Sequence, residues 1–170
     1  MRGGRIFRQR GVCVITMEPF KKVFYTNSPE ETIELGRQIG SRLKGGEIIA
    51  YKGGLGAGKT TITRGIALGM GLPDNVSSPT FSIVNEYHGS GLSLYHFDMY
   101  RISGGEDLET TGYFDYMSDD AVIAAEWSEN IEDELDSSVI TIELESTGGD
   151  GRKITVTDPN GADRFAGNWN

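Results

Sequence analysis

The stretch that decides the fold of this chain is GGLGAGKT, residues Gly53–Thr60, which satisfies the pattern GxxxxGK(S/T) at every fixed position. A short apolar segment, Glu47–Lys52, runs straight into it, and a helical stretch from Lys59 to about Met70 follows. Glycines let successive backbone N–H groups converge on a phosphate, and the start of the helix adds the positive end of its dipole. Strand, glycine loop and helix in this order predict a phosphate-binding loop for a nucleoside triphosphate.

Two side chains at the end of this loop have roles that follow from their chemistry. Lys59 is expected to reach the β- and γ-phosphates, and Thr60 is expected to supply its hydroxyl to Mg²⁺. A nucleoside triphosphate and Mg²⁺ are therefore the predicted cofactors. The loop residues expected to contact the nucleotide are Gly54, Leu55, Gly56, Ala57, Gly58, Lys59, Thr60 and Thr61.

Two acidic residues end apolar segments and are candidates for the carboxylate that such a site needs to hold Mg²⁺ or its water. Asp98 follows LSLYHF, and Glu126 follows AVIAA. The purer apolar run before Glu126 predicts a central strand, covered on both faces, whose carboxyl end faces the site. Capping, or pairing with Arg101 or Lys59, is the structural alternative for either carboxylate. Lys59, Asp98 and Glu126 are the predicted catalytic residues.

A threonine upstream of these strands is a candidate switch residue. Ser78-Pro79-Thr80 lies between the helix after the glycine loop and the next strand, where phosphate-loop switches place a Thr that senses the γ-phosphate. A Pro-containing turn that enters a strand is a common alternative. Taken by itself, the pattern favours the turn, so a catalytic role for Thr80 depends on the neighbouring motifs.

The rest of the chain alternates between strand and helix patterns. Ser28 is a good helix N-cap, and a helix from Pro29 to Leu43 follows a strand over Lys22–Thr26. The further predicted elements are strands Phe81–Tyr87, Leu92–Asp98 and Ala121–Glu126, short helices Glu106–Thr111 and Ser128–Leu135, and a hairpin of Val139–Glu145 with Lys153–Thr157 around a turn cluster Ser146–Gly151. Together they predict an α/β fold, a three-layer P-loop NTPase sheet with antiparallel edge strands.

Two absences from the sequence separate classes of phosphate-loop protein. None of the six lysines lies in an NKxD sequence that would read guanine, so ATP is favoured over GTP. Between Lys59 and Arg152 the only Lys or Arg residues are Arg64 and Arg101, whereas a small-molecule kinase would carry an Arg-rich lid. A Mg-dependent ATPase is the predicted activity. The alternatives are a small-molecule kinase with Asp98 as base, and a non-enzymatic ATP-dependent interaction module.

The 170 residues suit one domain. We expect residues 1–16 to be a disordered basic tail, residues 17–158 the P-loop ATPase domain, and residues 159–170 a flexible C-terminal tail. The apolar run Val12–Ile15 is far shorter than a signal-peptide core, and no segment reaches the roughly 18 apolar residues that cross a bilayer. The single cysteine, Cys13, excludes a disulfide-stapled scaffold.

Charge is unevenly distributed along the chain, whose net charge is −9. Residues 1–16 carry four arginines and no acid, whereas Glu106–Asp136 carries twelve acids and no base. Because binding to nucleic acid needs a basic surface, a direct grip on RNA or DNA is disfavoured. The acidic block is predicted to be a solvated face, and a docking surface for a basic partner is the alternative.

Four ordered motifs resemble those of one family. GGLGAGKTT at 53–61, SPTF at 78–81, LYHFDMYR at 94–101 and EW at 126–127 are similar, in order and spacing, to the bacterial TsaE (YjeE) ATPases, and the likeness covers Pro19–Val156. The resemblance implies a small cytoplasmic ATPase, slow without its partners, with no membrane or DNA partner. It would work with TsaD and TsaB in forming N6-threonylcarbamoyladenosine next to the anticodon of certain tRNAs. The tRNA would be reached indirectly, through the complex.

The same resemblance implies roles for single residues. By that likeness Thr60 and Glu126 would bind Mg²⁺, and Thr80 would act as the switch residue. Asp98 would support the metal or the attacking water.

The resemblance also extends the nucleotide site beyond the glycine loop. The family's nucleotide contacts the start of the first helix and an arginine near the last hairpin, which correspond here to Ser28–Thr32, with Thr32 as a predicted contact, and to Arg152. The family's Glu-Trp is often followed by Pro, where this chain has Ser128, itself a good helix cap. His96, inside LYHFDMYR, is predicted to be a packed strand residue rather than a proton carrier.

Overall fold

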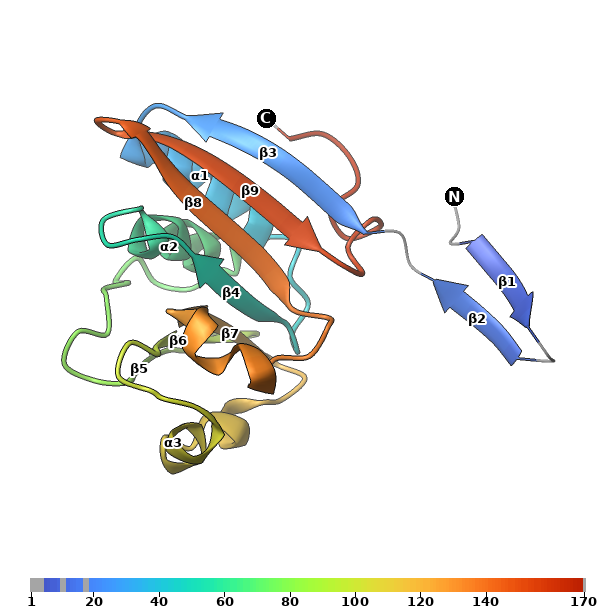
Figure 1. The fold of residues 1–170 in the computed structure, drawn as a ribbon. Helices are drawn as coiled ribbons and strands as arrows, with labels where there is room; N and C mark the ends of the chain where they lie inside the picture. The colour runs from blue at the N-terminus through green and yellow to red at the C-terminus, as the bar shows by residue number, and fades with distance from the viewer. Residues whose placement is uncertain (1–4, 10–11, 17–18, 170) are drawn as a thin grey trace.

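The computed structural model describes residues 5–9, 12–16 and 19–169, and at its centre lies a seven-stranded sheet of order β3-β9-β8-β4-β7-β6-β5 (Figure 1). The strands of this sheet are β3 (Phe20–Thr26), β4 (Ile48–Lys52), β5 (Val84–Tyr87), β6 (Ser93–Asp98), β7 (Ala121–Glu126), β8 (Ile140–Gly148) and β9 (Gly151–Asp158). The helices are α1 (Pro29–Gly40), α2 (Lys59–Gly69), α3 (Gly105–Thr110) and the 3₁₀ helices η1 (Tyr113–Tyr116) and η2 (Ser128–Glu134).

The middle of the sheet is parallel and its margins are antiparallel. β4 pairs in parallel with β7 and β8, and β6 pairs in parallel with β7. β9 runs antiparallel to β3 and β8, and β5 runs antiparallel to β6. Every residue of β7 is buried, as its uninterrupted apolar run predicted. The predicted α/β sheet with antiparallel edge strands is confirmed.

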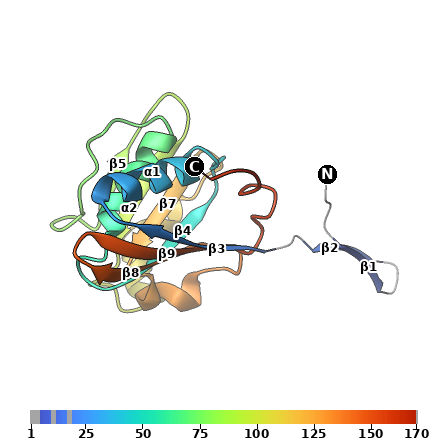
Figure 2. The same ribbon diagram turned by 90° about the horizontal axis from the view of Figure 1, so that it is seen from above.

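Helices cover both faces of the sheet and give the predicted three layers. α1 and α2 lie together on one face (Figure 2), where they share a core with Val122 and Ala124 of β7. α3, η1 and η2 contribute to a second core, which includes Ile123 and Ala125. Neighbouring residues of β7 enter opposite cores because successive side chains of a strand point to opposite faces.

α1 and α2 touch backbone to backbone. A Cβ added to Gly36 of α1 would collide with the carbonyl oxygen of Ile62, and one added to Gly65 of α2 would collide with the carbonyl oxygen of Ile33. Glycine inside a helix costs about 0.5–1 kcal/mol relative to alanine, so these residues weaken each helix taken alone. In return, they allow the two helix backbones to approach more closely than side chains would permit.

The ends of α1 show how local chemistry sets a helix boundary. The Ser28 hydroxyl accepts a hydrogen bond from the Glu31 N–H at 3.2 Å, and Pro29 stands in the first turn, as predicted. The helix ends at Gly40, before the predicted Leu43. Residues 41–43 instead form tighter turns, in which the Leu43 N–H donates to the Gly40 carbonyl at 3.2 Å.

The largest differences between predicted and observed strand boundaries, three residues each, are at the start of β5 and the end of β8. β5 begins at Val84 rather than Phe81, because residues 80–83 bend before the chain joins the sheet. The predicted turn cluster Ser146–Gly151 is largely strand, since β8 continues to Gly148 and β9 begins at Gly151. The short turn between them uses positive φ angles at two glycines, Gly148 and Gly149.

The N-terminal stretch differs from the predicted disordered tail where the structure describes it. Residues Arg5–Gln9 and Val12–Thr16 form two antiparallel strands, β1 and β2, which make a sheet of their own. Over the described ranges, no helix is long and apolar enough to cross a membrane.

The C-terminal residues 159–169 pack on the body of the protein, whereas the sequence predicted a flexible tail. Phe165 is buried in the first core, and the ring of Trp169 stacks 5.8 Å from that of Phe20. The guanidinium of Arg42 lies 4.3 Å from the Trp169 ring. Burial of the Phe165 ring and packing of the half-buried Trp169 ring offset the entropy lost in ordering the segment, which the turn-rich sequence after Asp158 did not indicate.

Candidate functional site

The phosphate loop of residues 53–58 joins β4 to α2 at the carboxyl end of the parallel strands, as predicted. Gly53, Gly56 and Gly58 have φ angles of 144°, 74° and 104°, which side chains rarely adopt. Gly53 also has no room for a side chain, because a Cβ there would lie 2.6 Å from the carbonyl oxygen of Leu144. Three of the four glycines of the motif, Gly53, Gly56 and Gly58, are therefore required by backbone geometry, whereas Gly54 is not.

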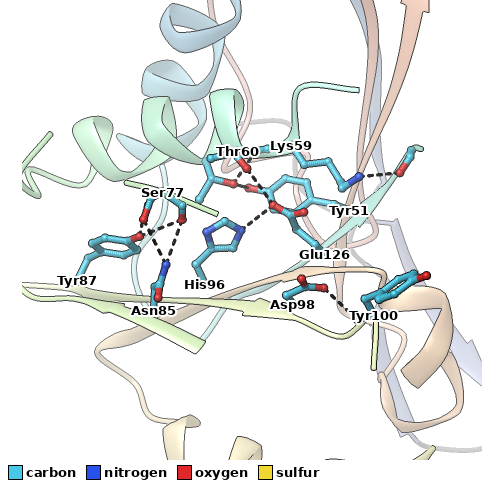
Figure 3. Close-up of polar contacts among 12 residues, drawn as sticks. Tyr51, Lys59, Thr60, Ser77, Asn85, Tyr87, His96, Asp98, Tyr100 and Glu126 are labelled. Carbon is cyan, nitrogen blue, oxygen red and sulfur yellow. Dashed lines mark hydrogen bonds and ion pairs between the residues drawn. The ribbon is translucent and has the colours of Figure 1, made fainter. Parts of the chain in front are cut away.

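Lys59, the first residue of α2, is buried with only 6% of its surface exposed. Its ammonium (Figure 3) donates hydrogen bonds to the carbonyl oxygens of Gly53 and Gly54, both at 2.8 Å. It also lies 5.2 Å from the centre of the Trp127 ring. Within the described part of the chain it forms no ion pair with a carboxylate. A buried cation held by neutral groups alone is suited to an anionic ligand.

Glu126 ends β7 and lies buried beside the start of α2 (Figure 3). Its Oε1 accepts hydrogen bonds from Thr60 Oγ1 at 3.3 Å and from His96 Nε2 at 2.9 Å. Burial acts to raise the pKa of Glu126, but the hydrogen bonds from His96 and Thr60, together with the positive charge of Lys59 beyond ion-pair distance, hold that pKa below its usual value. The ionised carboxylate and the Thr60 hydroxyl present the oxygen ligands that Mg²⁺ prefers.

Asp98 ends β6 and pairs in register with Glu126 on the neighbouring parallel strand. Its side chain is partly exposed, and its Oδ1 accepts a hydrogen bond from the Tyr100 N–H at 3.0 Å. Among the described residues, no side-chain hydrogen bond or ion pair joins Asp98 to Glu126 or Thr60. The two predicted carboxylates thus lie side by side at one edge of the sheet, but only Glu126 contacts the phosphate-loop helix.

Thr80 lies in an exposed loop that leads to β5, and no contact in the described part of the chain joins it to Lys59, Thr60 or Glu126. Two side chains of β5 hold the loop: Asn85 Nδ2 donates to the Ser77 carbonyl at 3.2 Å and Asn85 Oδ1 accepts from Ser82 Oγ at 2.9 Å, while the Tyr87 hydroxyl accepts from the Ser77 N–H at 3.1 Å (Figure 3). The switch role of Thr80 stays a prediction. The Asn85 anchor was missed from sequence, because it depends on the bend that delays the start of β5.

Thr32 and Arg152 meet beside the phosphate loop, although they come from α1 and β9. Both line a small cavity, which also has Pro29, Gly58, Thr61 and Asp150 in its wall. The Arg152 guanidinium donates to the carbonyl oxygens of Ala57 at 2.8 Å and Gly56 at 3.2 Å, so it braces the loop from outside. Thr32 is buried, with its Oγ1 2.8 Å from that of Thr26.

Trp127 is an element of the site that sequence reasoning did not assign. It follows Glu126 with a φ of 57°, the only positive φ of a non-glycine residue in the described ranges. Its ring packs at 5.1 Å against that of Tyr100 and faces the Lys59 ammonium. A left-handed conformation is costly for a bulky residue and clusters at functional sites. The sequence feature that could have indicated a role for Trp127 is its position directly after Glu126 at the end of a strand.

Comparisons with known proteins agree with this geometry. Residues 26–154 match the family model described as "Threonylcarbamoyl adenosine biosynthesis protein TsaE". A tRNA threonylcarbamoyladenosine biosynthesis protein TsaE of Bacillus subtilis (strain 168) is 39% identical over 132 residues, which cover 78% of this chain and 82% of that protein. The protein of the same name from Treponema pallidum (strain Nichols) is 36% identical over 131 residues, 77% of this chain and 96% of that protein. A crystal structure of YdiB from Bacillus subtilis superposes with a TM-score of 0.64 at 33% identity, covering 84% of this chain and 88% of that one.

Proposed function

This chain belongs to the TsaE family, and from that premise we propose that it binds ATP with Mg²⁺ and hydrolyses it in support of threonylcarbamoyladenosine formation in tRNA. The family role lies in tRNA threonylcarbamoyladenosine biosynthesis, and the phosphate-loop fold implies nucleotide binding. We assign the hydrolytic activity to residues 17–158.

The observation that carries the proposal is the buried ammonium of Lys59, which has backbone carbonyls and an aromatic ring around it and no carboxylate at ion-pair distance in the described part of the chain. A triphosphate supplies the missing negative charge. Lys59 then exchanges the carbonyls of Gly53 and Gly54 for phosphate oxygens, and the N–H groups of residues 54–61 add neutral donors around the same phosphates.

Mg²⁺ fits the donor set beside the loop. Thr60 and Glu126 hold it through a hydroxyl and an ionised carboxylate, both hard oxygen ligands. When bound, the ion neutralises charge that develops on the phosphates. Asp98, at the end of the next strand, orients the attacking water, and Thr80 senses the γ-phosphate.

The remaining contacts select and position the nucleotide. Thr32, Thr61 and Arg152 line the cavity beside Gly58 and hold the nucleoside end of ATP. ATP is preferred over GTP because the sequence offers no NKxD aspartate for guanine. Arg152 has a second task, since its hydrogen bonds to the loop carbonyls keep the loop in shape while the nucleotide exchanges.

The partners of the proposed cycle are TsaD and TsaB in the cytoplasm, with tRNA reached through their complex. The described residues at the site offer no nucleophile besides those assigned to phosphate chemistry, so transfer of the threonylcarbamoyl group belongs to a partner. ATP binding and hydrolysis in this chain would drive that machinery through its cycle.

The test is phosphate release from ATP, measured for this chain alone and with TsaD, TsaB and tRNA added singly and together. We expect slow release by the chain alone and stimulation by the partners. A phosphorylated metabolite formed in proportion to the ADP would show a small-molecule kinase instead. Full support of tRNA modification by a non-hydrolysable ATP analogue would show an interaction module in which hydrolysis is incidental.

A further inference from the structure

His96 is a completely buried imidazole whose only hydrogen-bond partner in the described part of the chain belongs to the proposed metal site (Figure 3). It lies on β6, opposite Ala124 of β7 and therefore diagonal to Glu126. Its neighbour on the same face of β6, Leu94, is part of the core beneath α2. The sequence predicted His96 as a packed strand residue, and it is packed, but its contact is with the site.

The hydrogen bond between His96 and Glu126 shows which ring nitrogen carries the proton and which carboxylate oxygen accepts it. His96 Nε2 lies 2.9 Å from Glu126 Oε1, whereas His96 Nδ1 has no hydrogen-bond partner among the described residues. Because a carboxylate only accepts, Nε2 carries the proton and donates it to Oε1. Thr60 donates to the same oxygen, and no hydrogen bond within the described ranges ends on Glu126 Oε2.

A histidine at this position is poorly suited to a purely structural role. A buried polar group without a partner costs about 1–3 kcal/mol, and Nδ1 of His96 is such a group. A leucine would fill the core without that cost. The presence of a histidine is therefore explained by its Nε2, which donates a hydrogen bond to the carboxylate of Glu126.

We propose that His96 is a positioning residue for Mg²⁺ binding, which fixes the Glu126 carboxylate by engaging Oε1 so that the carboxylate keeps its contact with Thr60 and has Oε2 available for the ion. The inference rests on the proposed function, since it concerns the same site. Groups that orient a metal ligand in this way typically change metal affinity by roughly 10–100-fold when they are removed.

Three substitutions of His96 separate positioning from packing. His96→Gln places an amide nitrogen at about the reach of Nε2, so it retains a donor for Glu126. His96→Asn places its nitrogen at about the reach of Nδ1, too short to donate to Oε1. His96→Leu removes every donor and keeps an apolar side chain. His88→Gln, at an exposed histidine that contacts Ser93 and Glu86, is the matched control.

The measurement is ATP binding by calorimetry as Mg²⁺ is titrated from an EDTA baseline, with the melting temperature recorded for each variant. We expect His96→Asn and His96→Leu to raise the Mg²⁺ concentration at half effect by roughly 10-fold or more, with ATP affinity in EDTA unchanged. His96→Gln should restore most of the Mg²⁺ response, and His88→Gln should match the unsubstituted protein.

The outcomes that overturn the inference differ from those that overturn the proposed function. If the unsubstituted protein responds to Mg²⁺ and the Asn variant responds equally, His96 does not position the metal ligand. The same conclusion follows if Gln and Asn fail alike, or if the loss appears equally in EDTA. Should His96→Leu not fold, the Gln and Asn pair decides. If the unsubstituted protein itself does not bind ATP or does not respond to Mg²⁺, the proposed function falls and the inference falls with it.

Discussion

The phosphate loop and the loop of residues 77–83 border the same edge of the sheet but are held in different ways. Lys59 reaches back to two carbonyls at the start of the phosphate loop, and Arg152 braces two more near its end. The other loop is held only near its ends, by Asn85 at Ser77 and Ser82 and by Tyr87 at Ser77, and Thr80 between them is exposed. The groups that would hold phosphates are thus preformed, whereas the group predicted to sense them is not yet in contact with the site.

This difference has a physical meaning for a nucleotide cycle. A segment with few buried contacts opens and closes at low free-energy cost, whereas a segment fixed along its length does not. We therefore expect substitutions in the phosphate loop to affect both binding and turnover. Substitutions in the loop of residues 77–83 should affect turnover with little change in binding.

The largest effect is expected at Lys59. Lys59→Ala should reduce ATP hydrolysis by about 100-fold or more and weaken ATP binding, because it removes a preorganised cation from the phosphates. Because the structure buries this side chain, Lys59→Met is the better-matched variant, since it keeps the aliphatic stem. Phosphate release and calorimetry measure both effects. Near-normal hydrolysis by a folded Lys59→Met protein would show that the loop is not the catalytic site.

The next largest effect should distinguish the two carboxylates. Glu126→Gln should raise the Mg²⁺ concentration needed for half-maximal hydrolysis by roughly 10–100-fold, since a neutral amide is a poorer ligand for a hard cation. Asp98→Asn should lower turnover while leaving that concentration nearly unchanged, because in the described part of the chain the Asp98 side chain forms no hydrogen bond with Thr60 or Glu126. Mg²⁺ titrations of both variants make the comparison. The opposite pattern would mean that the two roles are reversed.

A smaller effect is expected at Thr80. Its substitution tests most directly whether the loop of residues 77–83 affects turnover without affecting ATP binding. Thr80→Val keeps the shape of the side chain and removes its hydroxyl. Turnover should fall by about 10-fold, which corresponds to the loss of one hydrogen bond to the γ-phosphate formed after ATP has bound. ATP affinity should be unchanged. Thr110→Val, at an exposed threonine of α3, is the control. A parallel loss of ATP affinity would show that Thr80 is already part of the binding site.

The smallest effect should come from the anchor of the same loop. Asn85→Ala removes the hydrogen bonds to Ser77 and Ser82, and we expect turnover to change by about threefold, with ATP affinity retained. Hydrogen exchange of residues 77–83 should become faster. Asn75→Ala, in an exposed turn outside this loop, serves as its control. Unchanged exchange in Asn85→Ala would mean that other contacts hold the loop.

Patterns that are local in sequence predicted the fold and the centre of the site. The glycine loop, the helix cap at Ser28 and the apolar run before Glu126 each depend on residues that are close along the chain. The order of strand, loop and helix then determines where Lys59 and Thr60 lie. These features were confirmed because backbone geometry leaves few alternatives for them.

Contacts between distant segments could not be predicted in the same way. The hydrogen bond from His96 to Glu126 depends on the register of two strands, and the brace from Arg152 depends on how far the last hairpin extends. The packing of Phe165 and Trp169 depends on the ring of Phe20 in β3 and on Arg42, just beyond the end of α1. A single sequence contains these residues but does not indicate which of them meet.

The backbone contact between α1 and α2 has a mechanical consequence. No side chains separate the two helices at Gly36 and Gly65, so no change of side-chain rotamer there could compensate for a shift of α2. Such a shift would therefore move α1 as well. α1 in turn is joined to strand β3 by the hydrogen bond between Thr32 and Thr26. A displacement of α2 caused by a bound triphosphate would thereby reach β3, the edge strand of the sheet.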